Sequence, residues 1–182
     1  MRSDLQQSAE GFSMVETVIS TAILATGLLS LAGVLAIGTQ HMGGSTPGLI
    51  AREKAREAVE SVHTARDTRV ITWAQIRNVP DGGVFLANAQ SLKTPGVDGL
   101  TNTADDGAVE EQRTAGLDNL LGTSDDVRTP LTDYTREIQI TNIVDANNVV
   151  NPNLRQIKVI VRYKVGGAWR TYTLTTFISS YS

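Results

Sequence analysis

Two short stretches in the middle of the chain share a pattern of aspartates. GVDGLTNTADDG, residues 96–107, aligns position for position with GLDNLLGTSDDV, residues 116–127. In each copy one aspartate precedes an Asp-Asp pair, and the Gly and Asn residues between them favour a turn. Carboxylate and carbonyl oxygens on a flexible loop are the ligands that Ca²⁺ takes in proteins. The repeat therefore predicts one or two calcium ions, held by Asp98, Asp105, Asp106, Asp118, Asp125 and Asp126.

The same aspartates have a second interpretation. Asp, Asn, Gly and Thr are equally typical of water-exposed turns in which the side chain bonds to nearby backbone. Neither copy has the D-x-D-x-D-G pattern and closing glutamate of an EF-hand. Two acidic turns repel each other unless a cation lies near them, which favours calcium. The sequence leaves both interpretations open.

A single carboxylate, Glu16, stands at the edge of a long apolar stretch. Residues 17–38 carry no charged side chain, and as a helix they would extend about 33 Å, which matches the hydrocarbon thickness of a bilayer. Apolar and small residues occupy every helical face, so no polar stripe remains for solvent. A carboxylate here is costly unless it is paired, neutralised or able to reach the interface. We therefore expect a membrane-spanning helix and a partner for Glu16.

The composition excludes several other kinds of chemistry. The chain has no cysteine and two histidines, and neither histidine lies in a nucleophile motif. Disulfides, thiolate catalysis and cysteine-based metal sites are therefore excluded, and we predict a protein that is not an enzyme. A formal net charge of -3 gives no field that attracts nucleic acid, so we predict no DNA-binding function.

The residues before the apolar stretch resemble a known processing signal. GFSMVE, residues 11–16, combines a glycine, an aromatic residue and a glutamate five positions after the glycine. This resembles the leader of the type IV pilin and pseudopilin family, and GLLSLAGV in the apolar stretch is similar to minor pilins of the pilus-modification class. The resemblance implies that a prepilin peptidase cleaves between Gly11 and Phe12 and methylates the amine of Phe12.

The resemblance also gives Glu16 a role in assembly. Cleavage would create an ammonium on Phe12 about one helical turn from Glu16. In the family, the amine of one subunit meets the glutamate of its neighbour, which fixes the axial register of a filament. The implied partners are the prepilin peptidase, an inner-membrane assembly machinery and other pilins in a homo- or heteropolymer. The chain would be a single-pass inner-membrane precursor, and afterwards part of an extracellular pilus or a periplasmic pseudopilus.

Periodicity predicts the elements that position these residues. GGSTPG at residues 43–48 indicates a break in the helix, and apolar residues at helical spacing predict an amphipathic second half that ends at residue 66. Residues 67–132 contain the acidic repeats and few long apolar runs, so we expect a long loop insertion there. Within residues 133–182, alternating apolar and polar positions predict three antiparallel strands.

The expected fold class is α+β, with a long, broken N-terminal helix packed on a small antiparallel sheet. Five basic residues on the predicted strands are expected on an outer, solubilising face: Arg155, Lys158, Arg162, Lys164 and Arg170. The predicted segments are a leader, a membrane or filament-core helix, an amphipathic half-helix, a loop-rich region and a sheet: residues 1–11, 12–42, 43–66, 67–132 and 133–182.

The function implied by the resemblance is that of a structural subunit, major or minor, of a type IV pilus-like surface filament. A pseudopilin of a type II secretion system shares the same leader and stays open as an alternative. A membrane-anchored, calcium-dependent adhesion or binding module is a third possibility, because the acidic turns of residues 96–107 and 116–127 serve it equally well.

Overall fold

A computed structural model of the chain describes residues 13–43 and 45–181. The chain divides into two compact units, one ending at Gly43 and the other beginning at Gly44. The described part of the first unit forms a single helix, and the second unit, the head, combines a helix with β-strands. The predicted cleavage site between Gly11 and Phe12 lies outside the described residues.

The first unit is the apolar helix α1 (Met14–Gly43). Its stretch Met14–Leu35 has a mean hydropathy of 2.1, and its side chains are exposed. Thr17 and Thr21 donate their hydroxyls to the carbonyls of Ser13 and Thr17 at 3.2 and 3.0 Å, so these polar groups need no water. The helix is therefore long and apolar enough to cross a membrane, as the sequence predicts.

The helix of the head, α2 (Ser45–Asp67), buries small apolar side chains at helical spacing against the sheet. The buried residues are Ala51, Ala55, Ala58, Val62 and Ala65. Because most of them are alanine, the helix backbone can lie close to the strands.

The break between the helices is shorter than the sequence predicts. Pro47 and Gly48 lie in the first turn of α2 and do not interrupt it. A proline is accommodated there because the first amides of a helix have no intrahelical acceptor. Gly48 has a further reason to lack a side chain, since a Cβ atom would come within 3.3 Å of the Tyr163 hydroxyl.

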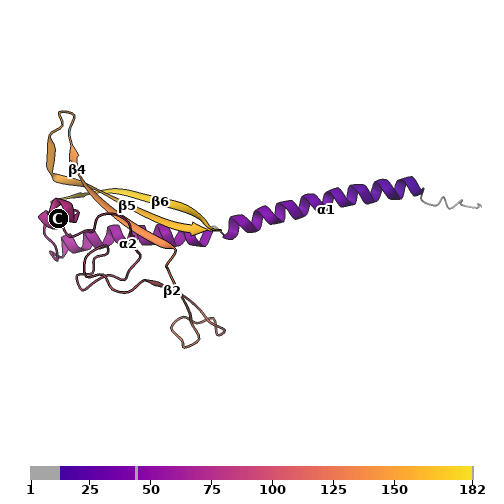
Figure 1. The fold of residues 1–182 in the computed structure, drawn as a ribbon, viewed down its shortest axis with the longest axis horizontal. Helices are drawn as coiled ribbons and strands as arrows, with labels where there is room; N and C mark the ends of the chain where they lie inside the picture. Colours follow the sequence, from indigo (N-terminus) through magenta and orange to yellow (C-terminus); the bar gives the residue numbers. More distant parts are fainter. Residues whose placement is uncertain (1–12, 44, 182) are drawn as a thin grey trace, which may run out of the picture. The chain divides into compact units, whose positions relative to one another are not determined.

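Four strands of the head form an antiparallel sheet in the order β1-β4-β5-β6, and α2 lies along one of its faces (Figure 1). They are β1 (Gln90–Ser91), β4 (Tyr134–Val144), β5 (Val150–Val165) and β6 (Ala168–Ser179). Gly166 and Gly167 join β5 to β6 with φ of 58° and 85°, a tight hairpin turn that glycine adopts without strain. The predicted α+β class is confirmed.

Alternation along the strands decides which side chains face α2. The apolar residues of this alternation are buried or half-buried in the core: Ile138, Ile140, Ile157, Val159, Val161, Tyr172 and Leu174. On β5 the odd-numbered residues from Arg155 to Tyr163 are buried and face α2. The even-numbered residues form the outer face of the sheet, which is the face directed away from α2.

Two of the five residues predicted on the outer face have the inward parity, which corrects the sequence prediction: Arg155 is buried, and Arg170, opposite Tyr163, is exposed near the start of β6. Arg155 donates to the carbonyl of Ile76 at 2.8 Å and to that of Trp73, and its guanidinium lies 4.1 Å from the centre of the Trp73 ring. Arg155 has the same parity on β5 as Ile157, so the alternation itself directs it inward.

The region predicted as a loop insertion contains short regular elements that the sequence does not reveal. Two 3-10 helices, Trp73–Gln75 and Val79–Asp81, follow α2. Farther along, β2 (Glu111–Thr114) and β3 (Val127–Pro130) pair as a separate antiparallel ribbon. EQRT is polar throughout and VRTP has no regular alternation of apolar and polar residues, so no pattern marks them as strands. We call residues 111–130 the arm.

Candidate functional site

Glu16 lies in the first turn of α1 and its side chain is exposed. A helix N-terminus carries partial positive charge, which stabilises a carboxylate at this position. Its predicted partner, the amine of Phe12, lies outside the described residues. The structure therefore shows where the carboxylate stands on the helix, and the pairing stays a prediction.

The two acidic stretches fold into the same kind of loop. Asp98 accepts a hydrogen bond from the amide of Leu100 at 2.8 Å, and in the second copy Asp118 accepts one from the amide of Leu120 at the same distance. The last aspartate of each pair also caps the loop: Asp106 accepts from the amide of Asn102 at 2.9 Å, and Asp126 accepts from that of Gly122 at 2.8 Å. The sequence repeat is thus a structural repeat.

Backbone conformation explains why Gly and Asn recur in both copies. The first positive-φ position is Gly99 in one copy and Asn119 in the other, with φ of 72° and 55°. At the second such position the types are exchanged, with Asn102 at 62° and Gly122 at 94°. Gly and Asn are the residues that adopt this left-handed conformation most readily.

The middle aspartates, Asp105 and Asp125, bond to a threonine of their own loop. Thr103 donates its hydroxyl to Asp105 at 2.8 Å, and Thr123 donates to Asp125 at 2.6 Å. These bonds favour the ionised form and, helped by backbone amides, hold the pKa of both carboxyls below the ordinary value of 3.8.

The threonine bond makes the first loop sensitive to acid. Because the folded pKa of Asp105 is lowered, the stabilisation is complete above the unfolded pKa and is lost as the pH falls through the folded value. We expect Thr103→Val to raise the pKa of Asp105 toward its ordinary value, so that the loop opens at a higher pH. Carboxyl-carbon NMR titration checks this, with Thr123→Val as the matched control that shifts Asp125 instead. An unchanged Asp105 titration in the first variant contradicts the assignment.

The structure does not gather the six aspartates around a common point. Across the described residues, no three carboxylate or imidazole side chains come together as a metal-holding group. The carboxylate oxygens instead accept hydrogen bonds from loop amides and hydroxyls, which is the arrangement of Asx-rich turns. Calcium binding by either loop stays a prediction.

The two copies differ in what surrounds them. In the first, Leu100, Thr101 and Asn102 are fully buried. In the second, the leucines at Leu117, Leu120 and Leu121 are exposed by 98%, 62% and 68%. The two loops therefore share a local fold but differ in their surroundings, since only the first copy is packed into the head.

The first copy closes over a cluster of buried charges that the sequence does not reveal. Arg136 of β4 is fully buried and donates from Nε to the side-chain oxygen of Asn102 at 2.8 Å. The side-chain amide nitrogen of Asn102 in turn donates to the backbone carbonyl of Arg136 at 2.8 Å. Glu110 lies 3.9 Å from the Arg136 guanidinium. Lys54 of α2 contacts Glu110 and also pairs with Glu57 at 2.7 Å.

The electrostatics of this cluster depend on Glu110. Burial lowers the pKa of Arg136, and the Glu110 carboxylate opposes that effect. Burial alone would also lower the pKa of Lys54, but its bonds to Glu110 and Glu57 outweigh burial and raise it. One carboxylate thus compensates two cations from α2 and β4. The parity of Arg136, equal to that of Ile138, was the one sequence signal for its inward direction.

No family model, curated protein or solved structure matches the chain. What the protein does is therefore inferred from its own residues and their contacts.

Proposed function

We propose that the chain is a structural subunit, major or minor, of a type IV pilus-like surface filament. The observation that carries this proposal is Glu16, a lone carboxylate in the first turn of an exposed apolar helix of membrane length. It follows directly on GFSMV, the stretch that resembles a prepilin cleavage site. A membrane anchor alone has no need of a carboxylate at this position.

The proposed chemistry is a pair formed only after processing. Before cleavage the nitrogen of Phe12 is a neutral amide, and cleavage after Gly11 turns it into an ammonium that methylation leaves able to carry a proton. A carboxylate and an ammonium are each costly in an apolar filament core, but together they compensate one another. When the amine of one subunit meets Glu16 of the next, that compensation sets the register between helices.

The head is compatible with this role. An amphipathic helix covers one face of an antiparallel sheet, and the apolar surface of the first unit is exposed in the single chain. Such a helix is stable when inserted in a bilayer or when surrounded by the same helix of other subunits. The proposed partners are accordingly the inner membrane, the prepilin peptidase, the assembly machinery and other pilins.

The proposal predicts the N-terminus of the mature protein. Intact-mass and peptide analysis of material from native membranes or sheared surface fibres should show a chain that starts at Phe12 and carries an N-methyl group. A mature, functional chain that starts at Met1 would remove the amine that Glu16 is proposed to meet. That result would contradict the proposal and favour a membrane-anchored binding module.

The location of the processed chain separates the two machines. Material in sheared surface fibres supports a pilus, whereas processed chain that stays in the periplasm supports a pseudopilin of a type II secretion system. Both outcomes are consistent with cleavage after Gly11 and with the proposed pairing of Glu16.

A further inference from the structure

The first acidic loop shows what a loop of this shape does when it is packed. Leu100 and Thr101 are fully buried at its tip, and Asn102 exchanges two hydrogen bonds with Arg136 on β4. The Asn102 carbonyl also accepts from the amide of Leu86 at 2.7 Å. The loop is therefore a docking element that places apolar side chains and backbone groups against a surface that carries a cation.

The second loop, residues 116–127, has the same hydrogen-bonded frame but no such surface beneath it. The positions of Leu100 and Thr101 are taken by Leu120 and Leu121, which are exposed, as is Leu117. The loop also contains three aspartates and no basic residue. A loop that only links strands has no use for three exposed leucines, and apolar patches of this kind mark interaction sites.

The arm that carries this loop is weakly stabilised by its own contacts. It is a two-stranded ribbon of four residues on each side, and an isolated ribbon is marginally stable in water. Arg113 and Arg128 lie directly opposite one another across it, which adds repulsion between like charges. Binding to a partner would supply the apolar burial that the arm lacks.

The outer face of the sheet has the complementary composition. Lys158, Arg162 and Lys164 of β5 put cations on this face. Arg162 lies 3.9 Å from Glu137 and Lys164 lies 3.5 Å from Asp133, and pairs as exposed as these are weak enough to exchange partners. Trp169 and Phe177 of β6 are more than half exposed, and the Lys164 ammonium lies 4.9 Å from the centre of the Trp169 ring. Exposed aromatic rings among cations match a loop that presents leucines among aspartates.

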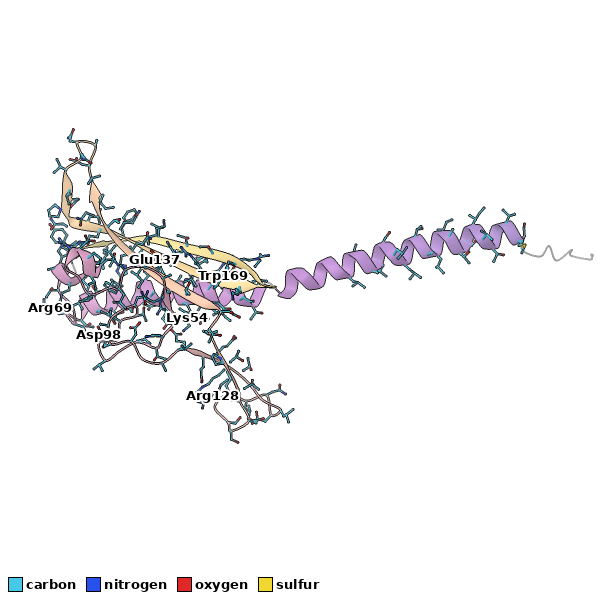
Figure 2. All side chains as sticks on the ribbon, viewed as in Figure 1. Lys54, Arg69, Asp98, Arg128, Glu137 and Trp169 are labelled. Carbon is cyan, nitrogen blue, oxygen red and sulfur yellow. The ribbon has the colours of Figure 1, made fainter. Side chains whose placement is uncertain are left out.

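The two surfaces lie on different sides of the head. The arm extends from the side of α2 opposite to the sheet (Figure 1). Arg128 on the arm is well separated from Glu137 and Trp169 on the sheet (Figure 2). A surface on one side that fits a different surface on the other makes a head-to-tail contact, which repeats from copy to copy and gives an open filament when the rotation does not close a ring.

We propose that the loop of residues 116–127 docks on the outer face of β5 and β6 of a second copy of this chain. Leu117, Leu120 and Leu121 pack against the ring of Trp169, and the loop aspartates meet the β5 cations. This inference rests on the proposed function, because a filament is what holds the heads of neighbouring copies together.

Cysteine cross-linking tests the contact, since the chain contains no cysteine. The test chain carries Leu117→Cys with Thr173→Cys, an exposed position on the outer face of β6, and is treated with a short bismaleimide in whole cells. We expect a ladder of dimers and larger species. The matched control carries Val97→Cys, the equivalent and equally exposed position of the first loop, with Thr173→Cys, and should stay monomeric. Adding Lys158→Glu and Lys164→Glu to the test chain should reduce the ladder severalfold.

Scoring the sheared fibres of the same cells separates this inference from the proposed function. A ladder supports the contact whether or not fibres form, and fibres that contain only monomer overturn the contact while sparing the filament proposal. Monomer without fibres overturns both. Three other results would each overturn the assignment to a second copy. They are a ladder that is equally strong in the Val97→Cys control, a ladder that the charge reversals do not reduce, and cross-links to a different protein.

Discussion

Glu110→Gln is expected to destabilise the head by about 3–5 kcal/mol, because it leaves a buried cation without its counter-charge. Arg136 is fully buried, and its two terminal nitrogens have no hydrogen-bond partner among the described residues. Its charge is therefore compensated mainly by Glu110 at 3.9 Å. The same substitution takes a carboxylate away from Lys54, so one change disturbs α2 and β4 together.

Removing the cation instead should cost less, because it leaves no buried cation without a counter-charge. Arg136→Met keeps a side chain of similar length, and its main cost is the lost hydrogen bond from Nε to Asn102, about 1–3 kcal/mol. Glu110 would keep Lys54 as its partner in this variant. The double variant Glu110→Gln with Arg136→Met should therefore be more stable than Glu110→Gln alone, a coupling that independent sites do not show.

Chemical denaturation of the full-length chain in detergent measures these effects. Both tryptophans, Trp73 and Trp169, belong to the head, so their fluorescence reports its unfolding. Glu111→Gln is the matched control, since the neighbouring Glu111 is exposed and should change stability by less than about 0.5 kcal/mol. Equal unfolding midpoints for Glu110→Gln and Glu111→Gln would show that the buried cluster does not stabilise the head.

The parts of this fold that the sequence predicted are those set by local periodicity. Apolar side chains at helical spacing gave the buried face of α2, and alternation gave the inward residues of β4, β5 and β6. A tight turn at Gly166 and Gly167 was likewise readable, because a two-residue hairpin turn needs positive φ.

The buried charge cluster was not predicted, because its members come from distant parts of the chain. Lys54, Glu110 and Arg136 meet only once α2, the loop region and β4 have packed. No local pattern distinguishes a lysine or glutamate with a buried partner from a solvated one. The error on Arg155 was different, since its parity with Ile157 already indicated that it faces inward.

The acidic repeat shows a further limit of local pattern. The two copies share their aspartates, their threonine and their positive-φ positions, and these residues predict a common loop. Burial depends on what each loop meets in the fold. At the tip, Thr101 and Asn102 of the buried first copy correspond to Leu121 and Gly122 of the exposed second copy, and this exchange does not by itself indicate which tip is buried.

Glu16→Val is expected to leave membrane insertion intact and to reduce filament yield by at least about tenfold. Losing a carboxylate makes the apolar helix easier to insert, so the membrane-bound precursor should accumulate normally. In the assembled filament the same change leaves the amine of Phe12 without its counter-charge in an apolar core. The loss of one partner of such a pair costs more than the approximately 1.4 kcal/mol that corresponds to a tenfold change in an equilibrium.

Quantitative immunoblots of the membrane and sheared-fibre fractions measure this prediction. Thr21→Val is the matched control, since it alters a nearby residue of α1 whose hydroxyl bonds only to its own helix. That variant should assemble at the normal level. If Glu16→Val fibres form with normal yield and regular spacing, register is set by other contacts and Glu16 has no part in assembly. If the precursor accumulates while fibres disappear, the carboxylate acts after insertion, at the step where subunits meet.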